Sequence, residues 1–449
     1  MRNIKSAFWG ILAVLALLWL IAEPTLFRSE TFFGLRAAMM QLTGVVAIGS
    51  MSVAMVLALR PRWPERWLGG LDKMYRLHKW FGIAALVAAV VHWLWAQGPK
   101  WAVGWGWLAR PMRGARSPVE NPVEAYFLSL RGVAEGVGEW AFYAAVALII
   151  LALLRYFPYR LFYKTHRLLA LSYLALAFHA VVLLDFRYWT SPIGWTTAVL
   201  LAAGVWAAGI VLLRRVGTDR QVKGTIVSFD YYPGVKSLET EIEVPGTWPG
   251  HKAGQFAFAM SDASEGAHPY TIASNWHPEN PRINFITREL GDHTGRLREK
   301  LKLGQEVRVE GPYGCFTFDD NCPQQIWVGG GIGITPFIAR MKHLAVPDGE
   351  PDWPLHQTVH LFHSTADVDE KAMEKLASDA RTANVRLHVV DSRRGRLTGE
   401  RIREVVPEWR DASIWFCGPT GFGAALKRDF ATLGFPVNER FHQELFAMR

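Results

Sequence analysis

Four histidines lie in the apolar first half of the chain, and their spacing favours a cofactor site. His78 and His92 are fourteen positions apart, His166 and His179 are thirteen apart, and no other histidine occurs before residue 213. Polar side chains are costly inside a bilayer, so an intramembrane histidine is a functional candidate by default. One such histidine could serve only in packing or at the membrane interface, but two matched pairs favour ligand chemistry.

Helix geometry places the four imidazoles in two layers. Fourteen residues rise about 21 Å along a helix and miss full register by about 40°, so His78 and His92 can face one interior. Thirteen residues leave an offset of about 140° between His166 and His179, which predicts a π-bulge or a tilted helix there. The two segments are separated by one other span and therefore run parallel. His78 is then level with His166, and His92 with His179.

This arrangement favours haem over other ligands. A proton relay normally involves carboxylates, which the apolar stretches of the two segments lack, and zinc requires a tight cluster of ligands. Two layers that each offer one imidazole per helix suit two b-type haems, with each iron held between axial histidines. We therefore expect His78 with His166 to bind an inner haem iron, and His92 with His179 an outer one.

The elements that hold these histidines are apolar runs of membrane-spanning length. We expect six membrane helices, near residues 6–22, 35–59, 78–97, 137–154, 166–184 and 193–213. The first run has no small-x-small cleavage site, which favours an uncleaved span over a secretory signal. The chain is therefore expected to be a multi-pass protein of the inner (plasma) membrane.

Charge sets the expected orientation of the spans. Three connections rich in Arg and Lys, at 60–76, 155–167 and 214–223, belong in the cytoplasm by the positive-inside rule. The basic loop at 98–135 favours the opposite orientation, but three basic loops favour this one. The N-terminus and the whole second half are thus expected to be cytoplasmic.

Composition narrows the partners. The net charge is +9, but the cations flank apolar runs and form no Lys/Arg block, so we expect a lipid bilayer and no nucleic acid as partner. All three cysteines lie in the second half, which fits a reducing compartment without a disulfide framework.

In the second half, apolar and polar residues alternate as they do in soluble proteins. Short strands at 224–232, 237–245, 255–261, 283–290 and 306–314 predict a small antiparallel barrel. From residue 324 a strand, Gly-rich turn and helix are followed by strands at 358–364, 385–392 and 413–419, which predict a parallel sheet. The expected fold class is thus multidomain: an all-α six-helix transmembrane bundle (1–216), an antiparallel β-barrel domain (217–322) and an α/β parallel-sheet domain (323–449).

Two motifs in this half resemble flavin-binding segments. "HPYTIAS" at 268–274 resembles the flavin-binding strand of ferredoxin reductase-type domains, in the form found in the ferric reductase and NADPH oxidase branch. The resemblance implies that four residues line FAD: His268, Pro269, Tyr270 and Thr271. "GDHTGRLREKL" at 291–301 matches the place of the FAD pyrophosphate, with Gly291 and Thr294 ahead of a helix N-terminus that offers free N–H groups.

Two further motifs resemble nicotinamide-binding turns. "VGGGIGITPF" at 328–337 follows an apolar strand, and its glycines would let the backbone approach a pyrophosphate. Its expected binding residues are Gly330, Gly331, Gly333, Thr335 and Pro336. In "CGPTGF" at 417–422, the resemblance places Cys417, Gly418 and Pro419 against the nicotinamide, with Cys417 as a catalytic candidate. A buried structural thiol is the alternative for Cys417.

Two further expectations concern the choice of coenzyme and the C-terminal aromatic residue. A 2′-phosphate needs cationic partners, and Arg393 and Arg394 in "DSRRGRL", helped by Ser364, favour NADPH, with NADH possible. Family members often end with an aromatic residue over the flavin. Phe446 is the candidate here, although the chain ends in Ala-Met-Arg, and a packed core position is the alternative.

The resemblance to the ferric reductase and NADPH oxidase superfamily covers the chain from the second expected span to its end. It implies that electrons pass from cytoplasmic NADPH through FAD and two b-type haems to an outside small-molecule acceptor. O₂ giving superoxide is the first expectation. A ferric or cupric chelate is the alternative, as is an electron-transfer subunit that serves a partner protein, although no obligatory protein partner is evident.

Arg36, at the outer start of the second expected span, is a catalytic candidate. Its cation could pair with the propionates of the outer haem or attract a reduced-oxygen anion. An interfacial arginine that snorkels to headgroups is the alternative. A non-enzymatic transporter or scaffold also stays open.

Overall fold

The computed structural model describes residues 2–24, 31–109, 119–154, 156–291, 293–345 and 357–444. The chain forms two compact units. One consists of Met1–Pro64 and Lys73–Val216, and the other of Glu65–Asp72 and Gly217–Met448. The short helix α3 (Glu65–Leu68) therefore belongs to the second unit, although it precedes most of the spans in sequence.

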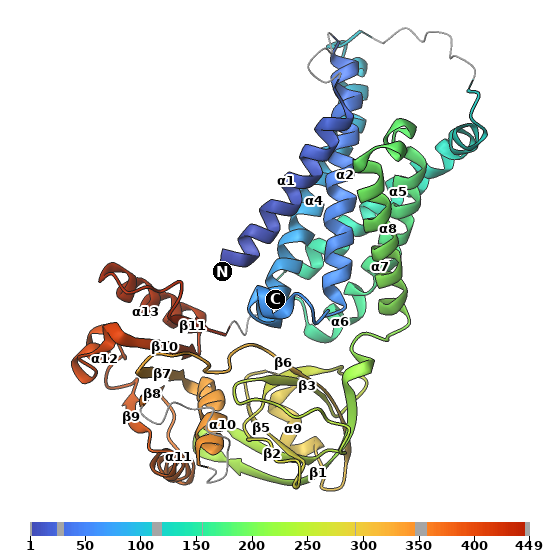
Figure 1. Cartoon of the computed structure of the whole chain (residues 1–449). Helices are drawn as coiled ribbons and strands as arrows, with labels where there is room; N and C mark the ends of the chain where they lie inside the picture. Colours follow the sequence, from blue (N-terminus) through green and yellow to red (C-terminus); the bar gives the residue numbers. More distant parts are fainter. Residues whose placement is uncertain are drawn as a thin grey trace. The chain divides into compact units, whose positions relative to one another are not determined.

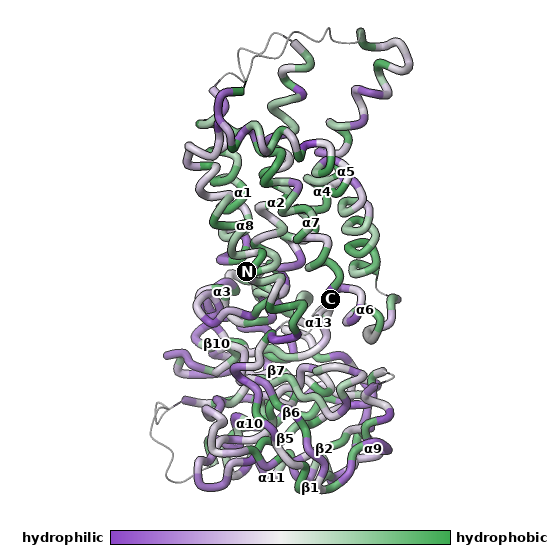
Figure 2. The backbone as a smooth tube through the Cα atoms, turned by 90° about the vertical axis from the view of Figure 1, so that its right-hand side faces the viewer, coloured by the Kyte–Doolittle hydropathy of each residue, from purple (hydrophilic) through white to green (hydrophobic). Residues whose placement is uncertain are grey.

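The first unit contains the six expected spans. Within the described residues, six helical segments are long and apolar enough to cross a membrane. They are α1 (Arg2–Ala22), α2 (Phe32–Ala58), α4 (Leu71–Gly104), α5 (Pro122–Leu153), α6 (Tyr159–His166) continuing into α7 (Leu168–Leu183), and α8 (Pro192–Leu212). Figure 2 shows green, hydrophobic stretches along these helices. The sequence prediction of six spans is thus confirmed.

Two spans are longer than hydropathy predicts. Helix α4 has 34 residues and α5 has 32, so both ends of the expected 98–135 loop are helical. Helix α5 begins where the Asn121 side chain accepts the N–H groups of Val123 and Glu124, with Pro122 in the first turn. Asparagine at the N-cap followed by proline is a start signal that hydropathy alone does not detect.

Between His166 and His179, where a π-bulge or a tilted helix is expected, the structure shows a one-residue interruption. Helix α6 ends at His166, and α7 begins at Leu168 after a single interrupting residue, Arg167. His166 and His179 therefore lie on separate helical segments. Arg167 keeps αR backbone angles (φ −66°, ψ −25°), so the interruption is a local irregularity within one span.

Helices α2, α7 and α8 lie side by side and form the core of the bundle (Figure 1). The Tyr173 hydroxyl of α7 lies 2.8 Å from Ser52 Oγ of α2. A Cβ atom at Gly204 of α8 would lie 2.0 Å from that hydroxyl, so only glycine fits there. Small residues at such contacts let transmembrane helices approach closely.

The second unit begins with a six-stranded antiparallel sheet. Its strands are β1 (Gln221–Tyr232), β2 (Ser237–Glu243), β3 (Phe256–Met260), β4 (His268–Thr271), β5 (Arg282–Arg288) and β6 (Glu306–Tyr313). Their order is β4-β3-β6-β1-β2-β5. A single bridge between Ile272 and Phe285 links the two edge strands, so the expected barrel is closed only approximately.

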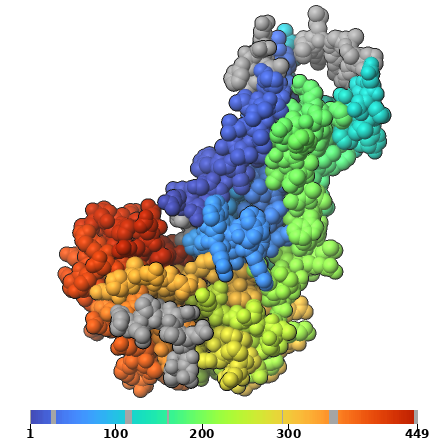
Figure 3. Space-filling model, viewed as in Figure 1, coloured from blue at the N-terminus to red at the C-terminus, as the bar shows by residue number. Residues whose placement is uncertain are grey.

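A parallel sheet follows, with order β11-β10-β7-β8-β9. The strands are β7 (Gln324–Gly330), β8 (Thr358–Thr365), β9 (Arg386–Asp391), β10 (Ala412–Cys417) and β11 (Phe441–Gln443). Its helices are α10 (Thr335–Leu344), α11 (Glu370–Thr382), α12 (Gly399–Val405) and α13 (Thr420–Thr432). In space-filling view the two sheet domains are adjoining lobes, yellow and orange-red (Figure 3).

The strand order reverses between β7 and β10, and ligands of such sheets bind at the carboxyl ends beside this switch point. Strand β11 was not predicted from the sequence. It is a three-residue edge strand that pairs with β10 and carries no periodic signal of its own.

Candidate cofactor sites

The four membrane histidines meet in two pairs. The ring centroids of His78 and His166 are 5.9 Å apart, and those of His92 and His179 are 6.3 Å apart. Two imidazoles that bind one metal from opposite sides, each with its nitrogen about 2 Å away, have centroids roughly 6 Å apart. The pairing and the spacing both suit one metal centre per pair.

Hydrogen bonds orient three of these imidazoles. Nδ1 of His78 lies 2.8 Å from the Ala54 carbonyl, Nδ1 of His92 lies 3.0 Å from the Met40 carbonyl, and Nδ1 of His179 lies 2.8 Å from the Ala134 carbonyl. A carbonyl only accepts, so Nδ1 carries the hydrogen and Nε2 keeps a lone pair. Metal-binding histidines almost always have this kind of outer partner.

His166 is oriented differently. Its Nδ1 is buried and has no hydrogen-bond partner among the described residues. Its ring stacks on Phe162 one turn earlier in α6, at a centroid distance of 4.9 Å and an interplanar angle of 22°. Packing therefore holds this imidazole where hydrogen bonds hold the other three.

Arg36 lies near the outer pair. Its Nε donates to the Trp95 carbonyl at 3.0 Å and its Nη2 to the Ala96 carbonyl at 3.3 Å. These carbonyls belong to α4, shortly after His92. Arg36 thus joins α2 to α4, and these two bonds use only two of the five N–H groups of its guanidinium.

The expected flavin residues lie on β4 and beside it. His268 stacks face to face on His293, at a centroid distance of 3.9 Å and an interplanar angle of 9°. Burial, and then the neighbouring His293, lower the pKa of His268 to about 4, so both rings are neutral at pH 7. Pro269 and Tyr270 pair with Phe258 and Ala257 of β3. The sequence reasoning did not single out His293.

Thr294 and Gly291 share one turn. The Thr294 hydroxyl accepts the Leu290 N–H at 3.0 Å and the Gly291 N–H at 3.2 Å. The helix that follows, α9 (Leu297–Lys300), has only four residues after one turn of 3₁₀ helix. The Thr294 hydroxyl therefore stabilises the turn, and the Gly291 N–H is already hydrogen-bonded to it.

The two glycine turns of the parallel sheet lie against each other at the switch point. A Cβ at Gly333 would lie 2.2 Å from the Cys417 carbonyl oxygen, and one at Gly418 would lie 3.0 Å from the Gly330 Cα. A Cβ at Gly330 would lie 2.9 Å from Pro419. The structure thus brings together the turns 330–333 and 417–419 that the sequence placed at one nucleotide.

Other residues of these turns point into the protein. The Cys417 side chain is fully buried, and burial raises the pKa of its thiol well above the ordinary value, so it is no thiolate. The Thr335 hydroxyl donates to the Ile332 carbonyl at 2.8 Å, and Pro336 is buried in the first turn of α10. Phe446 lies outside the described residues.

The basic residues expected near a 2′-phosphate have acidic partners. Arg393 pairs with Asp367 at 3.0 Å, and Arg394 pairs with Asp391 at 3.6 Å. Arg288 of β5 pairs with the other oxygen of Asp367. Ser364 lies one strand over from Gly330, as its register partner. Asp367 and Arg288 were missed, although an acid just past a strand of this sheet was visible in "FHSTAD".

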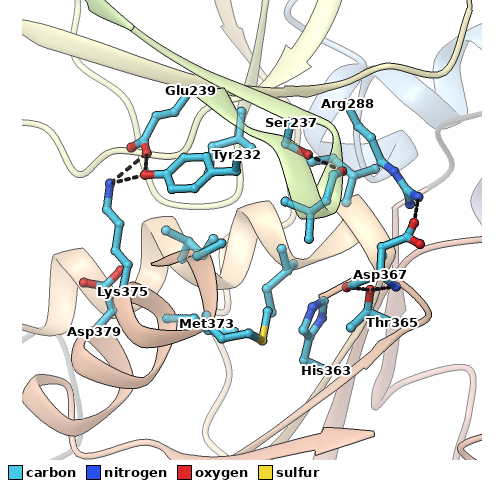
Figure 4. Close-up of a pocket in the computed structure, with 18 residues that line it drawn as sticks. Tyr232, Ser237, Glu239, Arg288, His363, Thr365, Asp367, Met373, Lys375 and Asp379 are labelled. Atoms are coloured by element: carbon cyan, nitrogen blue, oxygen red, sulfur yellow. Dashed lines mark hydrogen bonds and ion pairs between the residues drawn. The ribbon is translucent and has the colours of Figure 1, made fainter. Parts of the chain in front are cut away.

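A cavity of about 90 Å³ lies between the antiparallel sheet and helices α10 and α11 (Figure 4). The Arg288–Asp367 pair lies at one end, near Thr365. At the other end Glu239 accepts hydrogen bonds from Lys375 at 2.7 Å and Tyr232 at 3.1 Å. Burial opposes ionisation of Glu239, but the hydrogen bond and charge of Lys375 outweigh it and lower its pKa. These charge pairs join the two sheet domains.

Fold and sites together define a multi-pass membrane protein that carries an antiparallel flavin-type sheet and a parallel nucleotide-binding sheet. Residues 43–177 match the family described as "Ferric reductase like transmembrane component". The matched segment contains His78, His92 and His166 and ends two residues before His179. With its reductase-type second half, the chain fits a fusion of the ferric reductase and NADPH oxidase type.

Curated relatives are similar over part of the chain. An "NADPH oxidoreductase" of Mycobacterium tuberculosis is 28% identical over 261 residues, which cover 55% of this chain and 63% of that protein. A "Glycine betaine monooxygenase reductase subunit" of Pseudomonas aeruginosa is 29% identical over 212 residues, covering 43% and 56%. A "Flavohemoprotein" of Pseudomonas putida is 28% identical over 230 residues, covering 50% and 56%. The chain thus spans less than two thirds of the length of these relatives.

Among solved structures, the flavohem-like FAD/NAD binding domain of the nitric oxide dioxygenase from Vibrio cholerae O1 biovar El Tor is similar at 16% identity. The match covers 50% of this chain and 98% of that one, with a TM-score of 0.42. A score at this level supports no inference of its own.

Proposed function

We propose that this protein is a transmembrane oxidoreductase that takes electrons from a cytoplasmic nicotinamide nucleotide and delivers them to an acceptor outside. The observation that carries the proposal is the pairing of four histidines in two layers of one bundle, fused to a two-domain reductase. When bound, haem supplies one-electron chemistry, and FAD links it to two-electron nicotinamide chemistry.

The chain's part in the membrane is to hold and orient. His78 with His166 would bind the inner haem, and His92 with His179 the outer one. Donation from Nδ1 to backbone carbonyls supports the assignment for three of them, because it leaves the Nε2 lone pair for a metal. Because each iron would already be held by two histidines, the acceptor would react at the haem edge and not as an iron ligand. Arg36 would attract an anionic acceptor or pair with propionates.

The chain's part in the cytoplasm is to position two nucleotides. His268, Pro269, Tyr270 and Thr271 would line FAD, and the turn at Gly291 and Thr294 would receive its pyrophosphate. The facing turns 330–333 and 417–419 would hold the nicotinamide nucleotide. Their glycines support this, since they let the two turns approach each other closely at the switch point, where such sheets bind nucleotides. Phe446 would cover the flavin.

Topology is part of the proposal. We propose a protein of the inner (plasma) membrane, and the positive-inside pattern supports a cytoplasmic location for the N-terminus and residues 217–449. The division into 1–216, 217–322 and 323–449 would give one cofactor type to each domain. No protein partner is required by this scheme.

O₂, giving superoxide, is the first proposed acceptor, and a ferric or cupric chelate is the second. The test is oxidation of NADH and NADPH by the purified full chain, with and without O₂, and with a ferric chelate. Superoxide formed in proportion to nucleotide consumed supports the oxidase. Iron reduction that persists without O₂, with little O₂ uptake in air, supports the chelate reductase. Protein that binds neither haem nor flavin would refute both.

The outer pair has its own test. His92→Ala or His179→Ala should remove one haem and stop delivery to the acceptor while nucleotide still reduces the flavin. His277→Gln, at an exposed histidine of the second unit, is the matched control. Unchanged acceptor reduction in both outer-pair variants would refute the assignment.

A further inference from the structure

Two carboxylates stand where the adenosine half of a nicotinamide dinucleotide would lie. We propose that Asp367, supported by Asp391, makes this protein select NADH over NADPH. The inference rests on the proposed function, and it departs from the sequence expectation of NADPH. It comes from the partners that the fold gives to the arginines.

The sheet determines which end of the nucleotide meets these residues. The turn 330–333 follows β7, and the nicotinamide is assigned to the turn 417–419 after β10, its neighbour on one side. The adenosine must then extend over the neighbours on the other side, β8 and β9. The ends of these strands are paired in register, Thr365 with Asp391, and Asp367 follows two residues later.

Local hydrogen bonds hold Asp367 at this edge. The Thr365 hydroxyl accepts the Asp367 N–H at 3.2 Å and donates to its carbonyl at 2.9 Å. The Asp367 side chain is only 31% exposed and pairs with Arg288, as Figure 4 shows. It pairs with Arg393 as well. Residues of both sheet domains therefore hold the Asp367 carboxylate in place.

The arginines are already matched with acids. Arg393 donates through Nη2 to Asp367 and, through its backbone N–H, to Asp391 at 2.9 Å. Arg394 pairs with Asp391. A 2′-phosphate would have to separate these pairs and would lie beside two carboxylates. Separation of the pairs would leave Asp367 and Asp391 without their partners beside the phosphate, and like charges repel, so the pairs oppose NADPH.

A 2′-hydroxyl does not require these pairs to separate, because each carboxylate oxygen can accept a further hydrogen bond beside its arginine. A carboxylate is an acceptor only, and a ribose hydroxyl can donate to it. An acid past a strand of a dinucleotide-binding sheet commonly serves the ribose of NAD in this way. The same side chain thus favours one coenzyme and opposes the other.

The test uses the full chain, purified with FAD. Calorimetry gives the dissociation constants of NAD⁺ and NADP⁺, and anaerobic stopped-flow gives the rates at which NADH and NADPH bleach the flavin. We expect NADH to be preferred by at least about tenfold, equivalent to 1.4 kcal/mol. Asp367→Asn keeps the shape of the side chain but removes its charge. It should reduce the preference for NAD(H) over NADP(H) by about tenfold, both in the ratio of dissociation constants and in the ratio of flavin-reduction rates.

Further variants separate specificity from damage. Arg393→Ala added to Asp367→Asn should remove the gained NADPH binding, because the freed arginine would be its partner. Asp391→Asn should narrow the ratios in the same direction and serves if Asp367→Asn folds poorly. Glu306→Gln removes an acid of an exposed pair with Lys223 elsewhere in the unit and should leave both ratios unchanged.

Two outcomes would overturn the inference: a wild-type preference for NADPH, or ratios unmoved by both acid variants. If neither nucleotide bleaches the flavin, the proposed function fails. The calorimetric ratio still decides the inference in that case.

Discussion

Gly138 of α5 lies directly against the imidazole of His179 on α7. A Cβ atom built on Gly138 would lie 1.9 Å from Nδ1 of His179, far inside any allowed contact. One turn earlier in α5, the Ala134 carbonyl accepts the hydrogen bond from this nitrogen. The absence of a side chain at Gly138 is therefore what allows α5 to hold the ring.

Gly138→Ala should displace His179 and break its bond to Ala134. If His179 binds the outer haem, the variant should lose about one of two haems per chain, as shown by the pyridine haemochromogen assay. Gly136→Ala is the matched control, since a Cβ there would meet nothing within 4 Å and alanine favours the helix by about 1 kcal/mol. Full haem content in Gly138→Ala would contradict the outer-pair assignment.

The inner histidine pair should be required for electron transfer from the flavin to the haems. His166→Ala removes the imidazole that stacks on Phe162. We expect nucleotide to reduce the flavin normally while haem reduction and acceptor reduction fall to background. Stopped-flow spectra that follow flavin and haem bands separately provide the measurement. Fast reduction of the remaining haem in this variant would show that electrons bypass the inner pair.

Glu239 should contribute strongly to the stability of the reductase unit. Its carboxylate is 9% exposed and neutralises Lys375 and Lys342, at 2.7 Å and 3.7 Å. Glu239→Ala would leave Lys342 and Lys375 with Asp379 as the remaining nearby acid, which should lower the free energy of unfolding by about 2 kcal/mol. Chemical denaturation of the full chain, followed by tryptophan fluorescence, measures the change.

The control for the Glu239 prediction is a solvent-exposed ion pair of the same protein. Lys223 and Glu306 are 3.1 Å apart in the same sheet, with side chains 66% and 58% exposed. Glu306→Gln should change the free energy of unfolding by less than about 1 kcal/mol. Equal losses in the two variants would mean that burial does not set the value of the Glu239 pairs.

His251 should make the stability of the protein depend on pH. Burial lowers its pKa to about 4, against a partial rise from its bond to the Ser274 carbonyl at 3.1 Å. The unfolded chain therefore binds the proton first as pH falls, and the stability from neutral His251 is lost between about pH 6.5 and 4. His251→Gln should flatten the fall of the unfolding temperature from pH 7 to pH 5. His277→Gln, at an exposed histidine, should not.

Much of the architecture followed from local pattern. Six apolar runs and two kinds of strand rhythm predicted the membrane helices and the two sheets, because burial of each element is encoded in its own residues. The two pairings of membrane histidines also followed, since the rise per residue and the alternation of spans depend only on spacing.

The ends and interruptions of elements did not follow. Helices α4 and α5 continue past their apolar stretches because caps, not hydropathy, end a helix. The edge strand β11 forms by pairing with β10, which is remote from it in sequence.

The sequence by itself determined which groups this protein has for chemistry: four intramembrane imidazoles, two glycine turns and a basic "DSRRGRL" segment. The tertiary structure alone decided which of them are engaged. Arg393 is a free cation in the sequence, but in the fold it shares Asp367 with Arg288, which lies 79 positions before that aspartate. The charge available at a site depends on what packs against it, and packing joins residues that no local pattern connects.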